Sequence, residues 1–293
     1  MAGPEFATGG ALNFLIDLPV RGFFAAFRLL PYRAGLDLAG WIAAHVLAPL
    51  FGVNRRIRIN LKMVRPDMPD GEIRRLCHAV SANSARLMLE SFNTREFVRH
   101  AARAGFSGPG KERLLLALAE GQPVVLVSGH FGNYQVLRVL LARLGHKTAA
   151  IYRPMNNAYT NRRYIDNMDQ IATPNHPRGM TGTKALLTHL KKGGAIALLN
   201  DQAAFEGEKL QFMGKPALTM TSAAEFALKH RALLVPYYGI RRANGADFDV
   251  VVEEPVPHSD SGTMTQALND SLEAMVWQYP GQWFWIHRRW KWI

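Results

Sequence analysis

Residues 123–144 read PVVLVSGHFGNYQVLRVLLARL, and this stretch decides the fold. Its first six residues form a short apolar run rich in Val, which predicts a strand buried on both faces of a parallel sheet. Apolar side chains then recur at helical spacing, at Val136, Val139, Leu140 and Leu144. His130 therefore falls between the carboxyl end of a strand and the start of a helix, where open α/β sheets bind their ligands.

Strands and helices alternate along the rest of the chain. Helices are expected at residues 70–92, with Asp70 as N-cap, from 158, and at 111–120, 181–191, 221–230 and 264–277. Strands are expected at residues 147–152, 195–199, 233–240 and 248–252, with a strand and turn at 210–218. This order predicts an α/β fold with a mixed, largely parallel central sheet that helices flank on both faces.

The composition of the 293 residues suits a sizeable core and a polyanionic partner. Hydrophobic residues make up 48% of the chain, and 35 Lys and Arg against 23 acids give a net charge of +12. Such an excess favours nucleic acid, anionic lipid surfaces or phosphorylated substrates. The sequence lacks zinc-finger, RNP and helix-turn-helix patterns, so we expect no nucleic acid partner. The single Cys77 excludes an internal disulfide and favours a reducing compartment.

We divide the chain into three parts. Residues 1–10 contain GPEF, which is typical of a cloning remnant, and residues 55–293 form the α/β domain. Residues 11–54 are an apolar arm whose longest uncharged run has 17 residues, fewer than the about 20 that a spanning helix needs. The arm reads as two amphipathic helices in a membrane interface, with Trp41 and Phe51 as anchors. A pair of core helices is the alternative.

Two basic segments flank the domain. One follows the apolar arm, which favours a phosphate-rich surface over a solvated face, and contains Arg55, Arg56, Arg58, Lys62 and Arg65. The other mixes aromatic and basic residues at Trp283, Phe284, Trp285, His287, Arg288, Arg289, Trp290, Lys291 and Trp292. Its composition predicts a membrane interface or a glycan-phosphate site, with a core plug that has a basic rim as the alternative.

Polar residues near the ends of strands are the candidates for chemistry. The side chain of Gln135, in the first turn of its helix, can fold back onto the imidazole of His130. Asp201 follows the predicted strand 195–199 and is either a site acid or a turn cap. Four arginines are candidates for binding a phosphate with their guanidinium groups, and a side chain that faces solvent is the alternative for each. They are Arg153, Arg162, Arg163 and Arg178.

The segment SGHFGNYQ resembles the His-x-x-x-x-acid signature of the glycerolipid acyltransferase superfamily at all but its last position. The segments NLKMVRPD, YRPMNN, NDQ, QFMGKPA and PGQWFWIHRRWK are similar, in this order, to parts of the lipid A late acyltransferases of Gram-negative bacteria. They are also similar to relatives that acylate phosphatidylinositol mannosides. The resemblance runs from about residue 60 to the carboxyl end, and its ordered landmarks are more specific than the His signature alone.

The resemblance implies transfer of an acyl group from an acyl thioester to a hydroxyl of a membrane glycolipid, most simply a lipid A precursor. The donor is acyl carrier protein or coenzyme A, and neither a metal nor another cofactor is implied. His130 would be the general base, and Asp201 matches the acid of the family's DQ motif. We expect a monomer on anionic lipid at the cytoplasmic face of the bacterial inner membrane, peripheral or monotopic.

Other residues near His130 complete the expected site. Backbone N–H groups of the tight connection are expected to bind the oxyanion, at Gly129, Phe131 and Gly132. Asn133 and Gln202 are expected to bind substrate.

The sequence departs from the family signature at Gln135, where the family has a carboxylate that orients the imidazole. A glutamine carbonyl accepts a hydrogen bond from the ring N–H but cannot offset the charge of an imidazolium, and the comparable change in a serine protease lowers turnover about 10⁴-fold. Three explanations stay open: an engineered inactive Glu→Gln form, a natural active variant, or a natural pseudoenzyme. A non-catalytic lipid-binding protein and a thioester hydrolase are the alternative functions.

Overall fold

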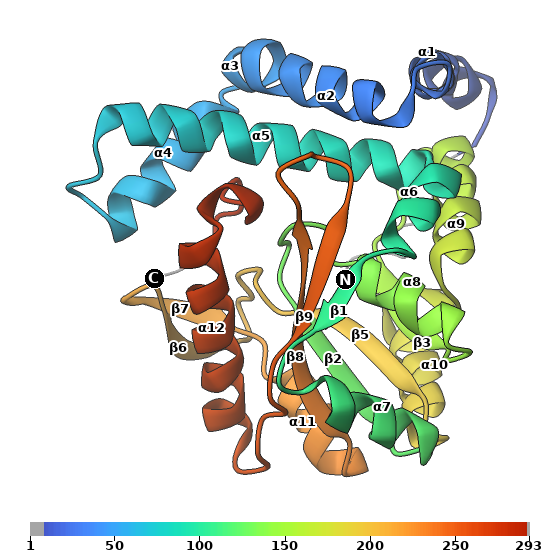
Figure 1. Ribbon diagram of the computed structural model, residues 1–293, viewed down its shortest axis with the longest axis vertical. Helices are drawn as coiled ribbons and strands as arrows, with labels where there is room; N and C mark the ends of the chain where they lie inside the picture. The colour runs from blue at the N-terminus through green and yellow to red at the C-terminus, as the bar shows by residue number, and fades with distance from the viewer. Residues whose placement is uncertain (1–8, 292–293) are drawn as a thin grey trace.

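A computed structural model describes residues 9–291 of the chain (Figure 1). In this range seven strands form one sheet in the order β1-β9-β8-β2-β5-β3-β4. Only the neighbours β8 and β9 are antiparallel, so the prediction of a mixed, largely parallel sheet is confirmed. The strands are β1 (Gly105–Ser107), β2 (Val124–Ser128), β3 (Thr148–Tyr152), β4 (Asn175–Pro177), β5 (Ala195–Leu199), β8 (Leu233–Arg241) and β9 (Phe248–Val252).

Strand β2 lies inside the sheet, between β5 and β8, and all five of its residues are buried. Val124 and Leu126 pack into the core on one face of the sheet, and Val125 and Val127 into the core on the other. Successive side chains of this strand point to opposite faces, and both faces are covered. Every position of the strand is therefore buried, which is why its sequence is an uninterrupted apolar run.

Helices cover both faces of the sheet. One face packs against α6 (Thr94–Ala101), α7 (Lys111–Ala119), α8 (Val136–Arg143) and α9 (Ala158–Ile171). The other packs against α10 (Met180–Lys191), α11 (Ser222–His230) and α12 (Ser261–Gln278). The short strands β1 and β4 and the helix α6 were not predicted, because three-residue strands and an eight-residue helix carry little periodicity.

Helix α5 (Asp70–Phe92) crosses above the sheet, between the sheet and the amino-terminal helices (Figure 1). Its predicted bounds are confirmed, but the prediction that Asp70 is its N-cap is wrong. Pro69 holds the cap position, and the carboxylate of Asp70 instead pairs with Arg58 at 2.8 Å. Pro69 has the extended backbone of a cap residue, with φ −62° and ψ 143°, so Asp70 already belongs to the first turn of the helix.

The amino-terminal arm consists of α1 (Ala11–Arg28), α2 (Tyr32–Ile42), the π-helical segment η1 (Ala43–Leu47) and α3 (Ala48–Leu50), and α4 (Val53–Val64) follows it. Asp17 is fully buried and ties α1 to α9, because its carboxylate accepts hydrogen bonds from Arg163 and Thr160. In the described residues no single helix is long and apolar enough to cross a bilayer. The helical segments Tyr32–Leu50 and Val53–Val64, which meet at 86°, are long and apolar enough only when they are taken together.

The carboxyl-terminal segment follows α12 and a 3-10 turn, η2 (Pro280–Gln282). Trp283, Trp285 and Trp290 are all at least 92% buried and pack with α4, α5 and α12, beside the hairpin of β6 (Glu208–Phe212) and β7 (Lys215–Thr219). The core-plug alternative is therefore correct for these three side chains, and the membrane-interface interpretation is wrong for them. Trp292 and residues 1–8 of the expected cloning remnant lie outside the described residues.

Candidate active site

The pairing of β2 with β5 brings His130 and Asp201 together. The two strands are parallel, with Ser128 opposite Leu199, so both chains leave the sheet at the same edge. Two residues further along each chain, His130 Nδ1 lies 2.7 Å from Asp201 Oδ1. The backbone N–H of His130 also donates to Asp201 Oδ2 at 2.8 Å. The acid that follows the second strand thus holds both the ring and the backbone of the histidine.

Asp201 is fully buried and ionised. Its Oδ2 accepts a third hydrogen bond, from the indole N–H of Trp283 at 2.8 Å. Burial alone would raise the pKa of this carboxyl, but the electrostatic interaction with His130 and the hydrogen bonds from it hold the pKa well below its usual range. A carboxylate beside Nδ1 fixes the proton on that nitrogen and leaves Nε2 as the acceptor.

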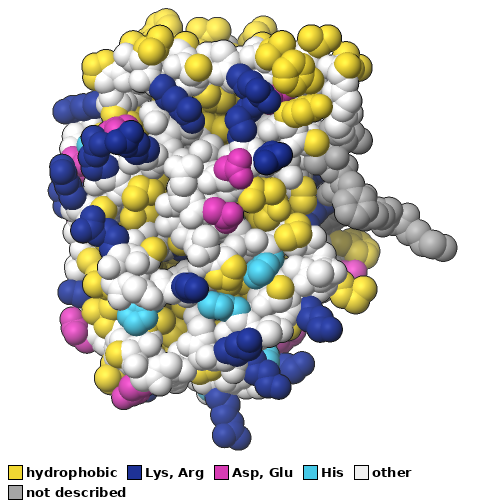
Figure 2. Space-filling model, turned by 90° about the vertical axis from the view of Figure 1, so that its right-hand side faces the viewer, with side chains coloured by type: hydrophobic (Ala, Val, Ile, Leu, Met, Phe, Trp, Pro, Cys, Tyr) yellow, Lys and Arg dark blue, Asp and Glu magenta, His cyan; other side chains and the backbone are white. Residues whose placement is uncertain are grey.

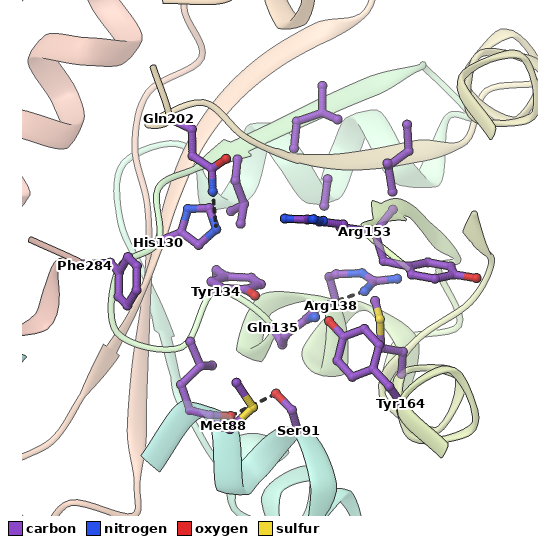
Figure 3. Close-up of a pocket in the computed structure, with 18 of the residues that line it drawn as sticks. Met88, Ser91, His130, Tyr134, Gln135, Arg138, Arg153, Tyr164, Gln202 and Phe284 are labelled. Atoms are coloured by element: carbon purple, nitrogen blue, oxygen red, sulfur yellow. Dashed lines mark hydrogen bonds between the residues drawn. The ribbon is translucent and has the colours of Figure 1, made fainter. Parts of the chain in front are cut away.

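A second histidine and an amide complete the cluster around His130. The ring centroid of His287 lies 4.7 Å from that of His130 in an edge-to-face contact, and burial lowers the pKa of His287 to about 4. Gln202 Nε2 lies 3.5 Å from Nε2 of His130 (Figure 3) and also 3.5 Å from Nε2 of His287. Donor atoms of His130, Asp201 and His287 lie within 4.8 Å of one another, close enough for a metal ion. Both carboxylate oxygens already accept N–H groups, which suits a hydrogen-bonded pair.

A cavity of about 700 Å³ opens beside His130. Its wall combines apolar side chains such as Leu87 and Met88 of α5 with Tyr134 and Tyr164 (Figure 3). Arg153 lies across the cavity from His130, and Arg178 also lines it. The cavity therefore joins an apolar lining, a histidine and guanidinium groups, a combination typical of a ligand with a long apolar part and an anionic part.

Of the other predicted substrate-binding residues, Gln202 lines this cavity and the remaining three do not. Arg162 is exposed and, like Arg163, is not part of the lining. Arg163 is held instead by Asp17, at 2.5 and 2.6 Å. Asn133 is 1% exposed and donates to Glu90, so it supports the loop and does not face the cavity.

Gln135 lines the cavity but has no hydrogen bond to His130 among the described residues. Its Oε1 accepts a hydrogen bond from Arg138 Nη1 at 2.9 Å, so the expected contact with the imidazole is replaced by a contact within the same helix turn. Asp201 occupies the place of the imidazole's partner. Arg138 is 1% exposed, and its remaining acceptors in this part of the chain are neutral: Thr148 O, Ala172 O and Asn175 Oδ1.

Two of the three predicted oxyanion donors are engaged within the protein, whereas the assignment of Gly129 stays a prediction. The N–H of Phe131 donates to Gly129 O at 2.8 Å, and that of Gly132 donates to Gln282 O at 2.9 Å. These two donors are used to shape the loop. Gly132 has a φ of 50°, and a Cβ there would collide with the backbone of Gly239, so this position requires glycine for packing.

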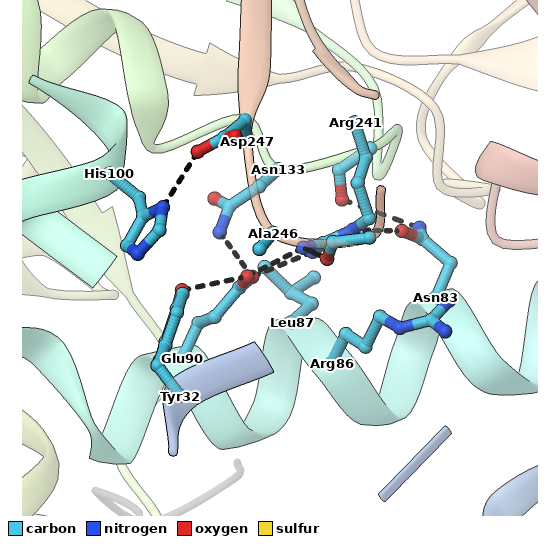
Figure 4. Close-up of polar contacts among 12 residues, drawn as sticks. Tyr32, Asn83, Arg86, Leu87, Glu90, His100, Asn133, Arg241, Ala246 and Asp247 are labelled. Atoms are coloured by element: carbon cyan, nitrogen blue, oxygen red, sulfur yellow. Dashed lines mark hydrogen bonds and ion pairs between the residues drawn. The ribbon is translucent and has the colours of Figure 1, made fainter. Parts of the chain in front are cut away.

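Helix α5 supports the histidine loop through a buried polar network that sequence reasoning missed (Figure 4). Glu90 accepts two hydrogen bonds from Arg241 of β8, at 2.5 and 2.6 Å, and one from Asn133 at 2.8 Å. Asn83 accepts from Arg241 Nε and donates to Gly132 O. A buried acid and a buried base, 151 residues apart, therefore fix the loop that follows His130.

The fold and the site define an α/β protein with a histidine–carboxylate pair beside a largely apolar cavity. Residues 11–292 match the family described as bacterial lipid A biosynthesis acyltransferase, and the chain belongs to that family. The resemblance found in the sequence is thereby confirmed.

Curated relatives match at low identity. The lipid A biosynthesis acyltransferase of Haemophilus influenzae is 23% identical over 60% of this chain and 56% of its own length. The lipid A biosynthesis lauroyltransferase of Escherichia coli is 23% identical over 62% of this chain and 60% of its own. The phosphatidylinositol mannoside acyltransferase of Mycolicibacterium smegmatis is 24% identical over 89% of this chain and 90% of its own. The chain thus spans little more than half of the first relative.

Proposed function

We propose that this protein transfers a fatty acyl group from an acyl thioester to a hydroxyl of a membrane glycolipid, with His130 as general base. The observation that carries the proposal is the pairing of His130 Nδ1 with the buried carboxylate of Asp201, at 2.7 Å. It leaves Nε2 directed toward the cavity, where an acceptor hydroxyl and an acyl carbonyl can meet.

In this reaction His130 Nε2 takes the proton of the acceptor hydroxyl as its oxygen attacks the thioester carbonyl. The tetrahedral intermediate collapses, the carbon–sulfur bond breaks, and the leaving thiolate takes the proton back from the imidazolium. Asp201 stabilises that imidazolium through Nδ1–H. We assign the oxyanion to the side-chain amide of Gln202, because this N–H donor lies 3.5 Å from Nε2 and the backbone N–H groups of Phe131 and Gly132 are engaged.

The cavity supports a substrate with both apolar and anionic parts. Its apolar wall suits an acyl chain, and Arg153 and Arg178 suit a phosphate, either of the glycolipid or of a phosphopantetheine donor. Relatives named for lipid A and for a phosphatidylinositol mannoside both act on glycolipids, which supports a glycolipid acceptor. A lipid A precursor is the first choice, and acyl carrier protein or coenzyme A is the donor carrier.

We place the enzyme on the cytoplasmic face of the bacterial inner membrane. Large apolar side chains are exposed along the arm and its end, where Leu12 is 71% exposed, Trp41 56%, and Leu50 and Phe51 72% each. Hydrophobic side chains gather along the upper end of the molecule, where α1 and α2 lie (Figure 2). An apolar surface of this kind favours an interface with lipid over full solvation.

We further infer that the protein with Gln135 is an active enzyme. The role of orienting the imidazole belongs to Asp201, and Gln135 is committed to Arg138, so an uncharged side chain at 135 does not remove the partner of His130.

A donor and acceptor panel tests the proposal. The purified full-length protein is given acyl carrier protein or coenzyme A thioesters with a lipid A precursor, a phosphatidylinositol mannoside or no acceptor, and products are measured by mass spectrometry. Acylated glycolipid from at least one pair supports the proposal. Free fatty acid formed equally with and without acceptor indicates a thioester hydrolase. Glycolipid binding without turnover by the folded protein indicates a lipid-binding protein.

A further inference from the structure

A second pocket, of about 340 Å³, lies outside the active-site cavity, between α4 and the carboxyl-terminal segment. No acidic side chain from residues 9–291 lines it. Its lining consists of Gly52, Arg55, Arg56, Ile59, Asn60, Met63, Arg288, Trp290 and Lys291. We call this the basic pocket.

Three arginines of the basic pocket carry a charge that no described residue neutralises. Within residues 9–291, the side chains of Arg55, Arg56 and Arg288 make no ion pair and no hydrogen bond, and all three are solvent-exposed or half-exposed. The first turn of α4, which carries Arg55 and Arg56, contains no acidic residue. Three guanidinium groups that line one pocket without a carboxylate beside them favour a bound phosphate, because a guanidinium can contact a phosphate with two parallel hydrogen bonds.

Apolar side chains next to the pocket indicate where that phosphate comes from. Ile59 and Met63, which line the pocket, are 50% and 39% exposed. Leu50 and Phe51 are 72% exposed and immediately precede Gly52 at the pocket's edge. A free phosphate or a nucleic acid would leave these apolar side chains exposed to water. A phospholipid would cover them, because its acyl chains lie beside its headgroup phosphate.

The basic pocket is connected to the catalytic histidines. Asn60 lines the pocket and donates from Nδ2 to the backbone carbonyls of Trp285 and His287, at 2.7 Å each. Arg288 lines the same pocket and directly follows His287, whose ring contacts that of His130. A group bound between Arg288 and α4 would therefore restrict the motion of the segment that carries His287.

We propose that the basic pocket binds the headgroup phosphate of an anionic phospholipid of the host membrane, and that this contact holds residues 283–291 in the arrangement the active site requires. The lipid is a bound activator and not a substrate, because the pocket is separate from the cavity beside His130. The activating role of the lipid rests on the proposed acyltransferase function. Binding of the lipid and ordering of residues 283–291 do not depend on it.

Vesicle co-sedimentation of the full-length protein tests the binding. The vesicles are pure phosphatidylcholine or phosphatidylcholine with phosphatidylglycerol. The site variant carries Arg55→Gln, Arg56→Gln and Arg288→Gln, and the control variant carries Arg103→Gln, Arg113→Gln and Arg143→Gln, which are exposed and outside the pocket. Both variants remove three positive charges. We expect the site variant to lose about 100-fold in affinity for phosphatidylglycerol vesicles and the control less than about threefold. Equal losses would overturn the pocket as the site.

Two further measurements separate lipid from phosphate and binding from activity. Inorganic phosphate that displaces the protein from vesicles at millimolar concentration would point to a free-phosphate site and overturn the lipid assignment. Hydrogen–deuterium exchange should slow in residues 283–291 when phosphatidylglycerol vesicles are added to the natural chain, and not in the site variant. Unchanged exchange in the natural chain would overturn the ordering role. These readouts stand even if no acyl transfer is found.

Discussion

The carboxylate of Asp201 accepts hydrogen bonds from two atoms of His130, the ring Nδ1 at 2.7 Å and the backbone N–H at 2.8 Å. The first bond sets which ring nitrogen carries the proton, and the second ties the loop to the end of β5. One buried acid thus controls both the chemistry and the position of the base.

Asp201→Asn should lower the turnover of acyl transfer about 10³- to 10⁴-fold while KM changes little. The amide keeps a similar shape but supplies no negative charge to the imidazolium and favours the wrong tautomer, as in the comparable serine protease variant. Steady-state kinetics measure the effect, and circular dichroism with a thermal melt serves as the control for folding. A folded variant with turnover within tenfold of the natural chain would remove Asp201 from the mechanism.

Gln135→Glu should change turnover less than about tenfold and raise the melting temperature. The new carboxylate would lie beside the guanidinium of Arg138, whose pKa burial lowers to about 10 and which has neutral acceptors in the described residues. Charge pairing with a group that is already buried stabilises more than a surface pair does. The two proteins are compared in the same transfer assay and melt. A gain of 10³-fold or more would mean that the acid of the family signature is required at this position after all.

His287 should make the protein less stable in mild acid. Its pKa is lowered from 6.5 to about 4 in the folded state, mainly by burial and against the attraction of Asp201, so the unfolded chain binds the proton more readily. This contribution is fully present above pH 6.5 and is lost as the pH falls to about 4, which amounts to about 3 kcal/mol.

Urea unfolding at several pH values measures this dependence in the natural chain and in His287→Asn. The variant should lose about 3 kcal/mol less between pH 6.5 and pH 4. Identical pH profiles would show that His287 titrates normally in the folded protein.

Glu90→Gln should lower the free energy of unfolding by about 3–5 kcal/mol, because it leaves the guanidinium of Arg241 buried without its charge partner. The double variant Glu90→Gln with Arg241→Met removes both charges and should be more stable than Glu90→Gln alone. Urea unfolding of the two variants and the natural chain provides the comparison. A single variant within 1 kcal/mol of the natural chain would contradict the role of this pair in holding α5 against β8.

The spacing of apolar residues was sufficient to predict most strands and helices, because an element that buries one or both faces repeats apolar residues at a regular interval. The strand at β5 and the helix at α5 matched their predicted bounds. Strand order leaves no such pattern. His130 and Asp201 were both placed at strand ends, but β3, β4 and three helices lie between β2 and β5 in the chain, so their contact could not be predicted.

Composition alone also could not distinguish a membrane interface from a buried core, because both use Trp beside Arg and Lys. Trp283 and Trp285 look like interfacial anchors beside Arg and Lys, yet they are 1% and 0% exposed. The buried pair of Glu90 and Arg241 is invisible in the sequence for the same reason. Arg138 carried a usable signal, because it interrupts an otherwise apolar helix face three residues after Gln135, which is the spacing of a contact within one turn.

The most direct test compares the natural chain with His130→Ala in transfer of a radiolabelled acyl group from acyl carrier protein to a lipid A precursor. If His130 is the base, the variant folds, still binds acyl donor, and forms acylated product at least about 10³-fold more slowly. If the folded variant transfers acyl groups at a rate within tenfold of the natural chain, the imidazole is not the base and the proposed mechanism is wrong.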